Sequence, residues 1–393
     1  MARRLVGIAA LAVAALLVAG CAETRKSMAG LCPAQRSSPG SAAGAEHVYS
    51  IDWWARADQT FALPYRPVEP GEPEVDPRTD HVFVGTADGK VRAFNSQGRF
   101  LWEHAVESAF DAGPTLADGR LYVAASKGQL LALDAASGKV IWEYASAEEI
   151  VTKPVVTEGL VIVMSSADTV FAVDQAKGDW RWQYRRDQPS DFTVRGAGRP
   201  VVFEGRVFAG FADGWAVALD SKDGVLQWAK DLGGGKPFAD VDAGPVMDEE
   251  GRVFFASFAT GLFALEAGTG KLIWTAPRAG ISALAMGEGG KRLFAGGNGF
   301  ISAFDGRSGQ VGWSERLGTD QFVSGMAVAS GLVLASTGSG PLMFFDGGTG
   351  RLRQSFDPGR GVWARPHVHG AQACVLSNRG VVYQMAIEAR GRP

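Results

Sequence analysis

The chain of 393 residues is poor in cysteine, with only Cys21, Cys32 and Cys374, and no two of them are adjacent. An oxidising compartment would permit a disulfide between two of these thiols. However, Cys32 lies in a stretch without hydrophobic periodicity, whereas Cys374 lies in an apolar run typical of a strand. We therefore expect Cys374 to be a buried free thiol.

Positive charge and histidine are also scarce. The chain has 39 Lys and Arg against 42 Asp and Glu, and its formal net charge of −3 argues against a nucleic-acid-binding protein. Among five histidines, His367 and His369 would share one face of a strand, but without a third ligand they make a weak metal site. No Ser-His-Asp arrangement, phosphate-binding loop or pair of catalytic carboxylates stands out, so we expect neither a metal nor a cofactor.

Only one long hydrophobic run is present, from Leu5 to Gly20, and it follows the basic start Met-Ala-Arg-Arg. It is short for a transmembrane helix and typical of a secretory signal. The run ends in Leu-Val-Ala-Gly-Cys21, which resembles a bacterial lipobox, whose cysteine becomes the lipidated first residue of the mature protein. The alternative is a signal peptide followed by a chance cysteine. We expect a signal peptide over residues 1–20, lipidation at Cys21 and a flexible Ala-, Ser- and Gly-rich tether over 21–48.

Glycine is abundant, with 52 residues, and much of it belongs to an internal repeat. Residues 251–274 contain three short β-rich runs separated by turns, which indicates an antiparallel sheet. A Gly, three residues and a Trp recur through the chain, and the tryptophans are Trp102, Trp142, Trp182, Trp228, Trp274 and Trp313. A seventh copy has Gln354 in place of Trp, and an eighth is partial.

A repeat of about 40 residues with four strands must stack on its copies to bury both faces, which predicts an all-β, eight-bladed β-propeller over residues 49–388. The last repeat lacks its outer strand, and residues 49–56 can supply it and close the ring of four-stranded antiparallel blades. We expect residues 57–79 to pass over the surface. Six tryptophans at one repeat position cannot face one cofactor, so we expect each to dock its blade on the next.

Two successive blade-to-blade connections are lengthened. A Pro often opens the innermost strand, and it follows the repeat Trp by 12 residues in the first two cases, but by 18 at Pro200 and 17 at Pro245. Equivalent connections lie at the same end of a propeller, so the two long ones should be neighbours. Extra length in a repeat usually marks the binding face.

The two long connections carry apolar and charged residues together. The first offers Phe192, Val194 and Arg195, and the second offers Asp240 and Asp242. Apolar anchors beside an arginine and two carboxylates predict a hot spot for a protein partner. Arg195 can instead pair with one of the two aspartates and order the loops, and both interpretations can hold because an internal pair can preorganise a surface.

The repeats, with their Ala-Leu-Asp, Gly-Lys and Trp elements, resemble quinoprotein-type propeller repeats. With the lipobox, Val194-Arg195-Gly196 ahead of Pro200 and Asp240-Val-Asp242-Ala-Gly-Pro245, the chain resembles the BamB family of outer-membrane β-barrel assembly lipoproteins. The resemblance implies a non-enzymatic, monomeric scaffold, held on the periplasmic face of the outer membrane by its acylated cysteine. It also implies that the two loops contact the POTRA domains of BamA and that the protein assists outer-membrane protein insertion. Family residues before the arginine are usually Leu, which Phe192 and Val194 match only by class.

Two other function classes stay open. One is an envelope-binding or adhesive propeller lipoprotein, which would not co-purify with a POTRA protein. The other is a dehydrogenase using pyrroloquinoline quinone and Ca²⁺, which has a similar fold but carries insertions and often an adjacent cysteine pair. This chain has little extra length and no such pair, and absorbance after adding quinone and Ca²⁺ would separate the two.

Overall fold

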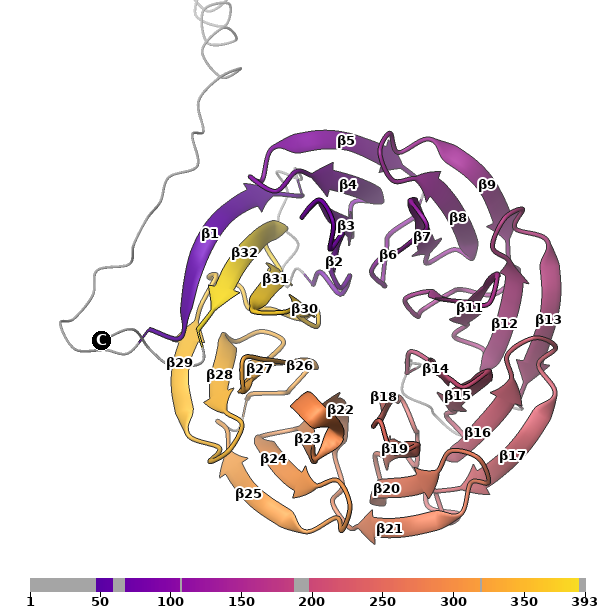
Figure 1. Cartoon of the computed structure of the whole chain (residues 1–393), viewed down its shortest axis with the longest axis vertical. Coiled ribbons are helices and arrows are strands. Elements are labelled where there is room, and N and C mark those ends of the chain that lie inside the picture. Colours follow the sequence, from indigo (N-terminus) through magenta and orange to yellow (C-terminus); the bar gives the residue numbers. More distant parts are fainter. Residues whose placement is uncertain (1–46, 59–67, 107, 187–197, 319, 389–393) are drawn as a thin grey trace, which may run out of the picture. The chain divides into compact units, whose positions relative to one another are not determined.

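The computed structural model describes residues 47–58, 68–106, 108–186, 198–318 and 320–388. These residues form eight four-stranded antiparallel sheets that stand around a centre as the blades of a β-propeller (Figure 1). The predicted eight-bladed fold is therefore confirmed. The described residues all belong to the second of two units of the chain, residues 40–393. Their one helix, the 3₁₀ turn η1 (Glu288–Gly290), is three residues long, and no helix within the described ranges is long and apolar enough to cross a membrane.

Each blade of the first half of the ring is a run of four consecutive strands that follow one another from the centre outward. Blade 1 contains β2 (Glu74–Val75), β3 (Val82–Thr86), β4 (Lys90–Phe94) and β5 (Phe100–Ala105). Blade 2 contains β6 (Thr115–Ala117), β7 (Arg120–Ala125), β8 (Gln129–Asp134) and β9 (Val140–Ala145). Blade 3 contains β10 (Val155–Thr157), β11 (Leu160–Met164), β12 (Thr169–Asp174) and β13 (Trp180–Arg185). Blade 4 contains β14 (Val201–Phe203), β15 (Arg206–Gly210), β16 (Trp215–Asp220) and β17 (Leu226–Asp231).

The second half continues in the same way until the chain ends one strand short. Blade 5 contains β18 (Ala243–Met247), β19 (Arg252–Ser257), β20 (Gly261–Glu266) and β21 (Leu272–Ala276). Blade 6 contains β22 (Ile281–Met286), β23 (Arg292–Gly297), β24 (Phe300–Asp305) and β25 (Val311–Arg316). Blade 7 contains β26 (Gly325–Ala329), β27 (Leu332–Ser336), β28 (Leu342–Asp346) and β29 (Leu352–Phe356). Blade 8 contains β30 (His367–His369), β31 (Gln372–Leu376), β32 (Val381–Ile387) and, as its outer strand, β1 (Tyr49–Arg56).

The hydrophobic core is divided among the eight seams between blades rather than gathered at the centre. Side chains alternate along a strand, so successive residues of β7 enter different seams. Leu121 and Val123 pack toward blade 1, whereas Tyr122 and Ala124 pack toward blade 3. The second strand of a blade is therefore buried on both faces, while the outer strand keeps alternate residues exposed. A residue buried in a seam thus stabilises two blades at once.

The ring is closed by antiparallel pairing of β1 with β32, from Tyr49 opposite Ile387 to Arg56 opposite Val381 (Figure 1). Trp53 on β1 is buried in the seam between blades 8 and 1. Cys374 lies in the same seam, and it is buried and free, as expected; burial raises the pKa of its thiol.

The repeated tryptophans reach across the seams. Each indole Nε1–H donates to a backbone carbonyl in the outer turn of the following blade. The pairs are Trp102–Ala135, Trp142–Gln175, Trp182–Ser221, Trp228–Ala267, Trp274–Gly306 and Trp313–Gly347, with N–O distances of 2.9–3.0 Å. The indole ring covers apolar surface of the neighbouring blade, and its N–H group holds the turn by a hydrogen bond.

The seventh repeat departs from this pattern because the eighth blade has no such turn. The outer strand of blade 8 comes from the other end of the chain, so blade 7 has no turn carbonyl to receive an indole. Gln354 stands there instead, and its Oε1 accepts a hydrogen bond of 3.0 Å from the N–H of Val48, just before β1. Gln354 pairs across the sheet with Phe344, at a position that is Ala in each of the Trp-bearing blades. Phe344 stacks on Tyr49 with ring centroids 4.9 Å apart.

The expectation that residues 57–79 pass over the surface is wrong for residues 69–76, whereas residues 77–79 are exposed. Glu69, Gly71 and Val75 are buried, and β2 is the innermost strand of blade 1. A two-residue strand shows no hydrophobic periodicity, so its pattern does not reveal it. Pro73 just before β2 is the signal that could have found it, because proline precedes other innermost strands as well.

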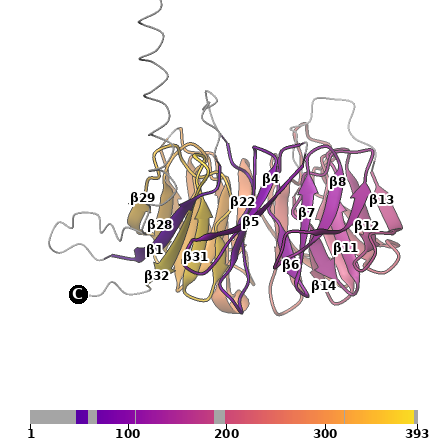
Figure 2. The same ribbon diagram turned by 90° about the horizontal axis from the view of Figure 1, so that it is seen from above.

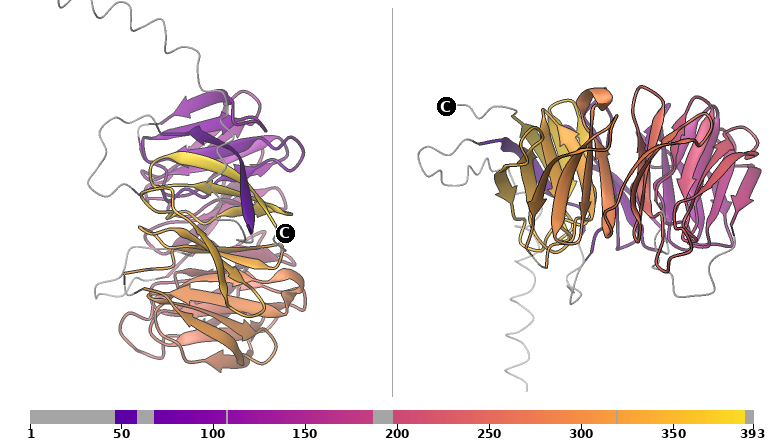
Figure 3. Two further views of the ribbon diagram at one scale, coloured as in Figure 1. Left: turned by 90° about the vertical axis from the view of Figure 1, so that its left-hand side faces the viewer. Right: turned by 90° about the horizontal axis from the view of Figure 1, so that it is seen from below.

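Seen from the side, the strands run between the two ends of the ring (Figure 2, Figure 3). Each connection that leads from the outer strand of one blade to the innermost strand of the next blade lies at one end of the ring. The turns between the second and third strands of the blades lie at that same end. We call this the connection end. Turns between third and outer strands lie at the opposite end. The connection between β17 and β18, which contains the predicted partner residues Asp240 and Asp242, lies at the connection end.

Candidate functional site

The two long connections at the connection end differ in how far the structure describes them. Phe192, Val194 and Arg195 lie outside the described residues. Gly198, at the end of the first connection, is described and abuts the second: a Cβ there would lie 2.9 Å from the carbonyl oxygen of Asp242. The described end of the first connection is therefore a direct neighbour of the second.

The second connection, between β17 and β18, folds back into the ring before blade 5 begins. Ala239, Asp240 and Val241 are all buried, with Asp240 only 3% exposed. The N–H of Val241 donates to the carbonyl of Phe211 at 3.1 Å, and the carbonyl of Asp240 accepts from the N–H of Phe258 at 2.9 Å. These bonds tie the segment to blades 4 and 5.

Asp240, one of the two carboxylates predicted to contact a partner, is thus buried at its place in the loop. Val241 packs in the seam between blades 4 and 5, Ala239 is buried as well, and the short segment carries Asp240 in between them. Burial raises the pKa of the Asp240 carboxyl. Asp242 is partly buried, and its pKa is raised by burial and then by the neighbouring Asp240.

A second buried carboxylate lies near Asp240. Asp168, in the turn between β11 and β12, is 2% exposed, and its Oδ2 has no hydrogen-bond partner among the described residues. Burial, assisted by the nearby carboxylates of Asp213 and Asp240, raises the pKa of Asp168 to about 6. Arg186 is paired with Asp213 at 2.6 Å and lies over the ring of Trp215 at 4.7 Å. This end of the ring is thus acidic beneath its surface.

Two exposed aromatic residues on the same end were not identified from the sequence. Phe238 is 54% exposed and is held by a backbone with φ of 55°, and Phe258, in the turn between β19 and β20, is 39% exposed. The bond from the N–H of Phe258 to the carbonyl of Asp240 places their segments side by side. A phenylalanine after Gly-Gly-Gly-Lys-Pro, within a long connection, is the sequence signal that could have pointed to Phe238.

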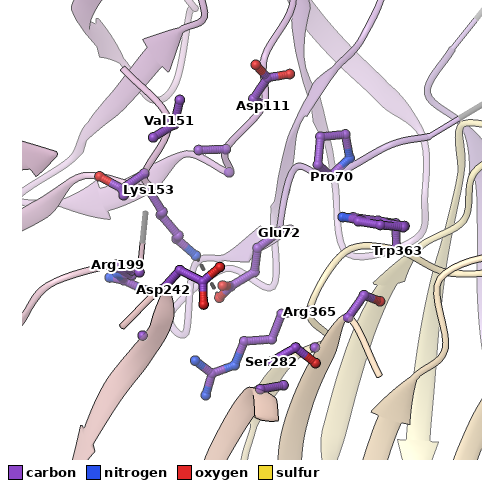
Figure 4. Close-up of a pocket in the computed structure, with 18 of the residues that line it drawn as sticks. Pro70, Glu72, Asp111, Val151, Lys153, Arg199, Asp242, Ser282, Trp363 and Arg365 are labelled. Atoms are coloured by element: carbon purple, nitrogen blue, oxygen red, sulfur yellow. Dashed lines mark hydrogen bonds and ion pairs between the residues drawn. The ribbon is translucent and has the colours of Figure 1, made fainter. Parts of the chain in front are cut away.

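The centre of the ring holds a cavity of about 270 Å³ to which all eight blades contribute. At six blades the lining includes the residue just before the proline that starts the innermost strand: Glu72, Gly113, Lys153, Arg199, Gly244 and Arg365. A residue before proline is restricted to extended conformations, so these positions adopt similar backbone geometry and face inward alike. Figure 4 shows the charged members converging on the centre, with Asp242 among them.

The floor of the cavity is a tight ion-pair cluster. Lys153, which is 5% exposed, pairs with Glu72 at 2.9 Å and with Glu74 at 2.8 Å. Nδ1 of His367 lies 3.8 Å from Glu72 and 3.6 Å from Glu74. Burial alone would raise the pKa of Glu72, but Lys153, the hydrogen bond with His367 and then two arginines outweigh it and hold that pKa well below its usual value.

Within the described ranges, no group of three or more His, Cys, Asp and Glu side chains could hold a metal ion. His367 is engaged with the glutamates of blade 1, and His369 is exposed at the end of β30.

Comparisons with known proteins agree on the architecture. No curated protein sequence matches the chain. Among solved structures, BamB from Moraxella catarrhalis matches with a TM-score of 0.76 and 19% identity, covering 86% of this chain and all of that one. A europium-containing methanol dehydrogenase has a TM-score of 0.71 and 14% identity, covering 86% of this chain and 93% of that one. The quinohemoprotein alcohol dehydrogenase of Comamonas testosteroni has a TM-score of 0.65 and 16% identity, covering 88% and 77%.

At these identities the structural matches show the fold alone. A family model provides the more specific finding. The model described as outer membrane protein assembly factor BamB matches residues 87–291 and 297–392. These two ranges include strands of every blade, together with the second long connection. Because the match covers well over half of the sequence, the chain belongs to the BamB family of outer-membrane protein assembly factors.

Proposed function

We propose that the protein is a non-enzymatic scaffold of the outer-membrane β-barrel assembly complex that binds the periplasmic POTRA domains of BamA. In this role it assists the folding and insertion of outer-membrane proteins. The observation that carries the proposal is the family match over residues 87–291 and 297–392. The shared fold with quinone dehydrogenases does not by itself transfer their activity, because one fold supports many functions.

We further propose that the protein is anchored to the periplasmic face of the outer membrane. The basic start, the apolar run and the lipobox-like ending at Cys21 support a signal peptide over residues 1–20 and acylation of that cysteine. Each acyl CH₂ buried in the bilayer contributes about 0.8 kcal/mol, so two or more chains hold a domain firmly. Residues 21–48 would then be the tether between the lipid and a propeller over residues 49–388.

The partner surface in this proposal is the connection end. Phe238 and Phe258 offer two exposed aromatic rings on segments joined by a backbone hydrogen bond. Aromatic side chains held rigidly are the usual energetic centres of protein interfaces. The predicted contacts at Phe192, Val194 and Arg195 belong to the neighbouring connection and would extend the same surface.

Asp240 and Asp242 receive different roles in this proposal. Asp240 is buried at the root of the loop, so it acts on the partner through the position of Phe238 and Phe258 rather than by direct contact. Asp242 faces the ring centre and supports the start of β18. A preordered loop loses less conformational entropy on binding, and this strengthens an interface without adding contacts.

A site-specific photo-cross-linker in living cells tests the proposal. We choose position 238, because Phe238 is exposed whereas the neighbouring Val241 is fully buried. The matched control is Lys222, which is exposed in the turn between β16 and β17 at the opposite end of blade 4. Capture of a POTRA-containing protein from position 238, but not from 222, is the expected result.

Equal capture from both ends would contradict the proposed surface. Capture of no POTRA protein from either position, with normal amounts of the variant in the envelope, would contradict the function itself. Adding pyrroloquinoline quinone and Ca²⁺ to the purified protein tests the enzyme alternative independently, since binding would change the quinone absorbance.

A further inference from the structure

Two arginines at the connection end of blade 6 flank one aromatic ring. The guanidinium carbon Cζ of Arg278, in the connection between β21 and β22, lies 3.9 Å from the centroid of the Phe300 ring. Arg316, the last residue of β25, is the cross-strand partner of Phe300 in the sheet. The ring of Phe300 is 8% exposed and packs closely on Gly297, where a Cβ would lie 2.8 Å from its Cζ. Phe300 is therefore a fixed platform beside two positive charges.

These two arginines have no counter-ion in the part of the chain that the structure describes. No ion pair or hydrogen bond joins either guanidinium to a described residue. Arg278 is partly buried, and this burial, followed by the positive charge of Arg316, lowers the pKa of Arg278. No carboxylate offsets either effect. Because a partly buried charge without a counter-ion is costly, a carboxylate supplied by a partner would relieve the penalty.

The arginines are continuous with the exposed aromatic pair Phe238 and Phe258. The N–H of Gly280, two residues after Arg278, donates to the carbonyl of Phe258 at 2.8 Å. Blade 6 follows blade 5 around the ring (Figure 1). Phe238, Phe258, Arg278 and Arg316 thus lie along one surface of the connection end, which we call the aromatic–arginine strip.

Other charged side chains near the strip leave its arginine part positive. Lys236, in the connection between β17 and β18, is exposed and adds positive charge. Glu315 precedes Arg316 on β25, so its side chain faces the other side of the sheet. Asp320 is exposed, but no ion pair joins it to a described arginine, and Asp240 is buried. The strip is therefore complementary to an acidic surface.

We infer that the partner places an acidic segment against Arg278 and Arg316 while its apolar side chains cover Phe238 and Phe258. The inference rests on the proposed function, and it specifies the chemistry of the POTRA surface that docks there. Guanidinium groups donate paired hydrogen bonds to carboxylates, and arginine and aromatic residues are the usual energetic centres of interfaces. Complementary charge also fixes the orientation in which the partner docks.

Biolayer interferometry between the full-length protein and BamA of the same organism, both purified in detergent, tests this inference. The double variant Arg278→Glu, Arg316→Glu should bind BamA about tenfold or more weakly, because it replaces attraction with repulsion. The matched control is Lys271→Glu, Arg351→Glu, which makes the same change of charge in exposed turns at the opposite end of the ring. The control should bind as the wild type does.

Ionic strength provides a readout that a folding defect would not imitate. The affinity of the wild type should fall as NaCl rises from about 50 to about 300 mM, since salt screens charges at an interface. The neutral variant Arg278→Gln, Arg316→Gln should show a shallower dependence on salt. A dependence as steep as that of the wild type would overturn the inference.

Arg316→Glu alone covers the case in which replacing the partly buried Arg278 impairs folding. Arg316 is exposed, so this variant should fold normally and bind about threefold or more weakly. If the wild type binds BamA and the arginine variants bind it equally well, the inference is overturned while the proposed function stands. If the wild type itself does not bind BamA, the proposed function fails, and the inference fails with it.

A photo-cross-linker at Ala279, which is exposed next to Arg278, identifies the docked segment in the same purified complex. Mass spectrometry of the cross-linked peptide gives its sequence. We expect a BamA peptide with net negative charge. A neutral or basic peptide would overturn the inference, even where the affinity measurements confirm that the complex forms.

Discussion

Gly178 in blade 3 lies against the indole ring of Trp142 in blade 2, so closely that a Cβ on the glycine would be 2.6 Å from Cε3 of the ring. The same indole donates to the carbonyl of Gln175, in the same turn, at 3.0 Å. The Gly and Trp of the repeat are therefore partners across a seam, not within one copy. The glycine that begins each Gly-x-x-x-Trp element receives the tryptophan of the preceding blade.

We predict that Gly178→Ala destabilises the protein far more than Gly159→Ala. Both glycines lie in turns of blade 3 with similar φ, 77° and 80°, but nothing lies within 4 Å of a Cβ built on Gly159. Gly159→Ala should lower the free energy of unfolding only by the cost of placing alanine in a left-handed conformation, about 1–2 kcal/mol. Gly178→Ala adds displacement of the Trp142 ring, for about 3 kcal/mol or more in total. Urea unfolding monitored by circular dichroism measures both, and equal losses would refute the role of the ring contact.

Trp142→Ala should lower the free energy of unfolding by about 3–5 kcal/mol, because it leaves a cavity in the seam between blades 2 and 3. Trp180→Ala is the matched control, since Trp180 is 53% exposed on the outer strand of blade 3 and Trp142 is 7% exposed. The control should change stability by no more than about 0.5 kcal/mol. A melting temperature for Trp142→Ala equal to that of the wild type would contradict a docking role for the repeated tryptophans.

Glu69→Gln should stabilise the protein at alkaline pH but not at acidic pH. Burial, with help from Asp58 and Asp88, raises the pKa of Glu69 to about 8 from an ordinary value near 4.5. The folded state then binds more protons than the unfolded state across this window, so stability falls as pH rises from about 4.5 to 8. At pH 8.5 the accumulated loss is on the order of 4 kcal/mol, which glutamine avoids while still accepting the N–H of Ala87.

Urea unfolding at pH 5 and pH 8.5 measures the effect of Glu69→Gln, with the exposed Glu249→Gln as a control for charge removal. The two variants should differ little at pH 5. If Glu69→Gln gains no more than the control on going to pH 8.5, Glu69 does not titrate as its buried position requires.

Cys21→Ala should abolish acylation and release the protein from the membrane fraction. The proposed lipid attachment is the only covalent link to the bilayer in our interpretation, and the described residues contain no membrane-spanning helix. Metabolic labelling with a palmitate analogue, followed by fractionation, checks both consequences. Cys32→Ala is the control and should keep label and location; label retained by Cys21→Ala would contradict acylation at this position.

Much of the fold could be predicted from local pattern. The Gly-x-x-x-Trp spacing, the turn residues and the apolar second strands recur because each blade solves the same problem of burying two faces. Even the partial last repeat predicted closure by residues 49–56, since an unpaired outer strand position needs a partner. The two-residue β2 escaped because it is too short to show a period.

The candidate site was predictable only in part. The spacing from each repeat Trp to the next Pro showed which connections are enlarged. It did not show that Asp240, between the buried Ala239 and Val241, is itself buried while Phe238 is exposed. The sequence does contain a signal for the central cavity, namely the residue before each inner-strand proline. Glu72, Lys153, Arg199 and Arg365 all occupy that position. Their convergence becomes visible only when the blades are placed around one centre.

The blade, its number of copies and the residues that join neighbouring blades can all be read from the sequence, because they depend on periodicity and turn chemistry within about 40 residues. Which charged side chains meet depends instead on how the blades are arranged in space. Glu72 and Lys153 are 81 residues apart and pair at 2.9 Å because the ring brings the start of every inner strand to its centre. No local pattern encodes a contact between blades 1 and 3, since it depends on closing the whole ring.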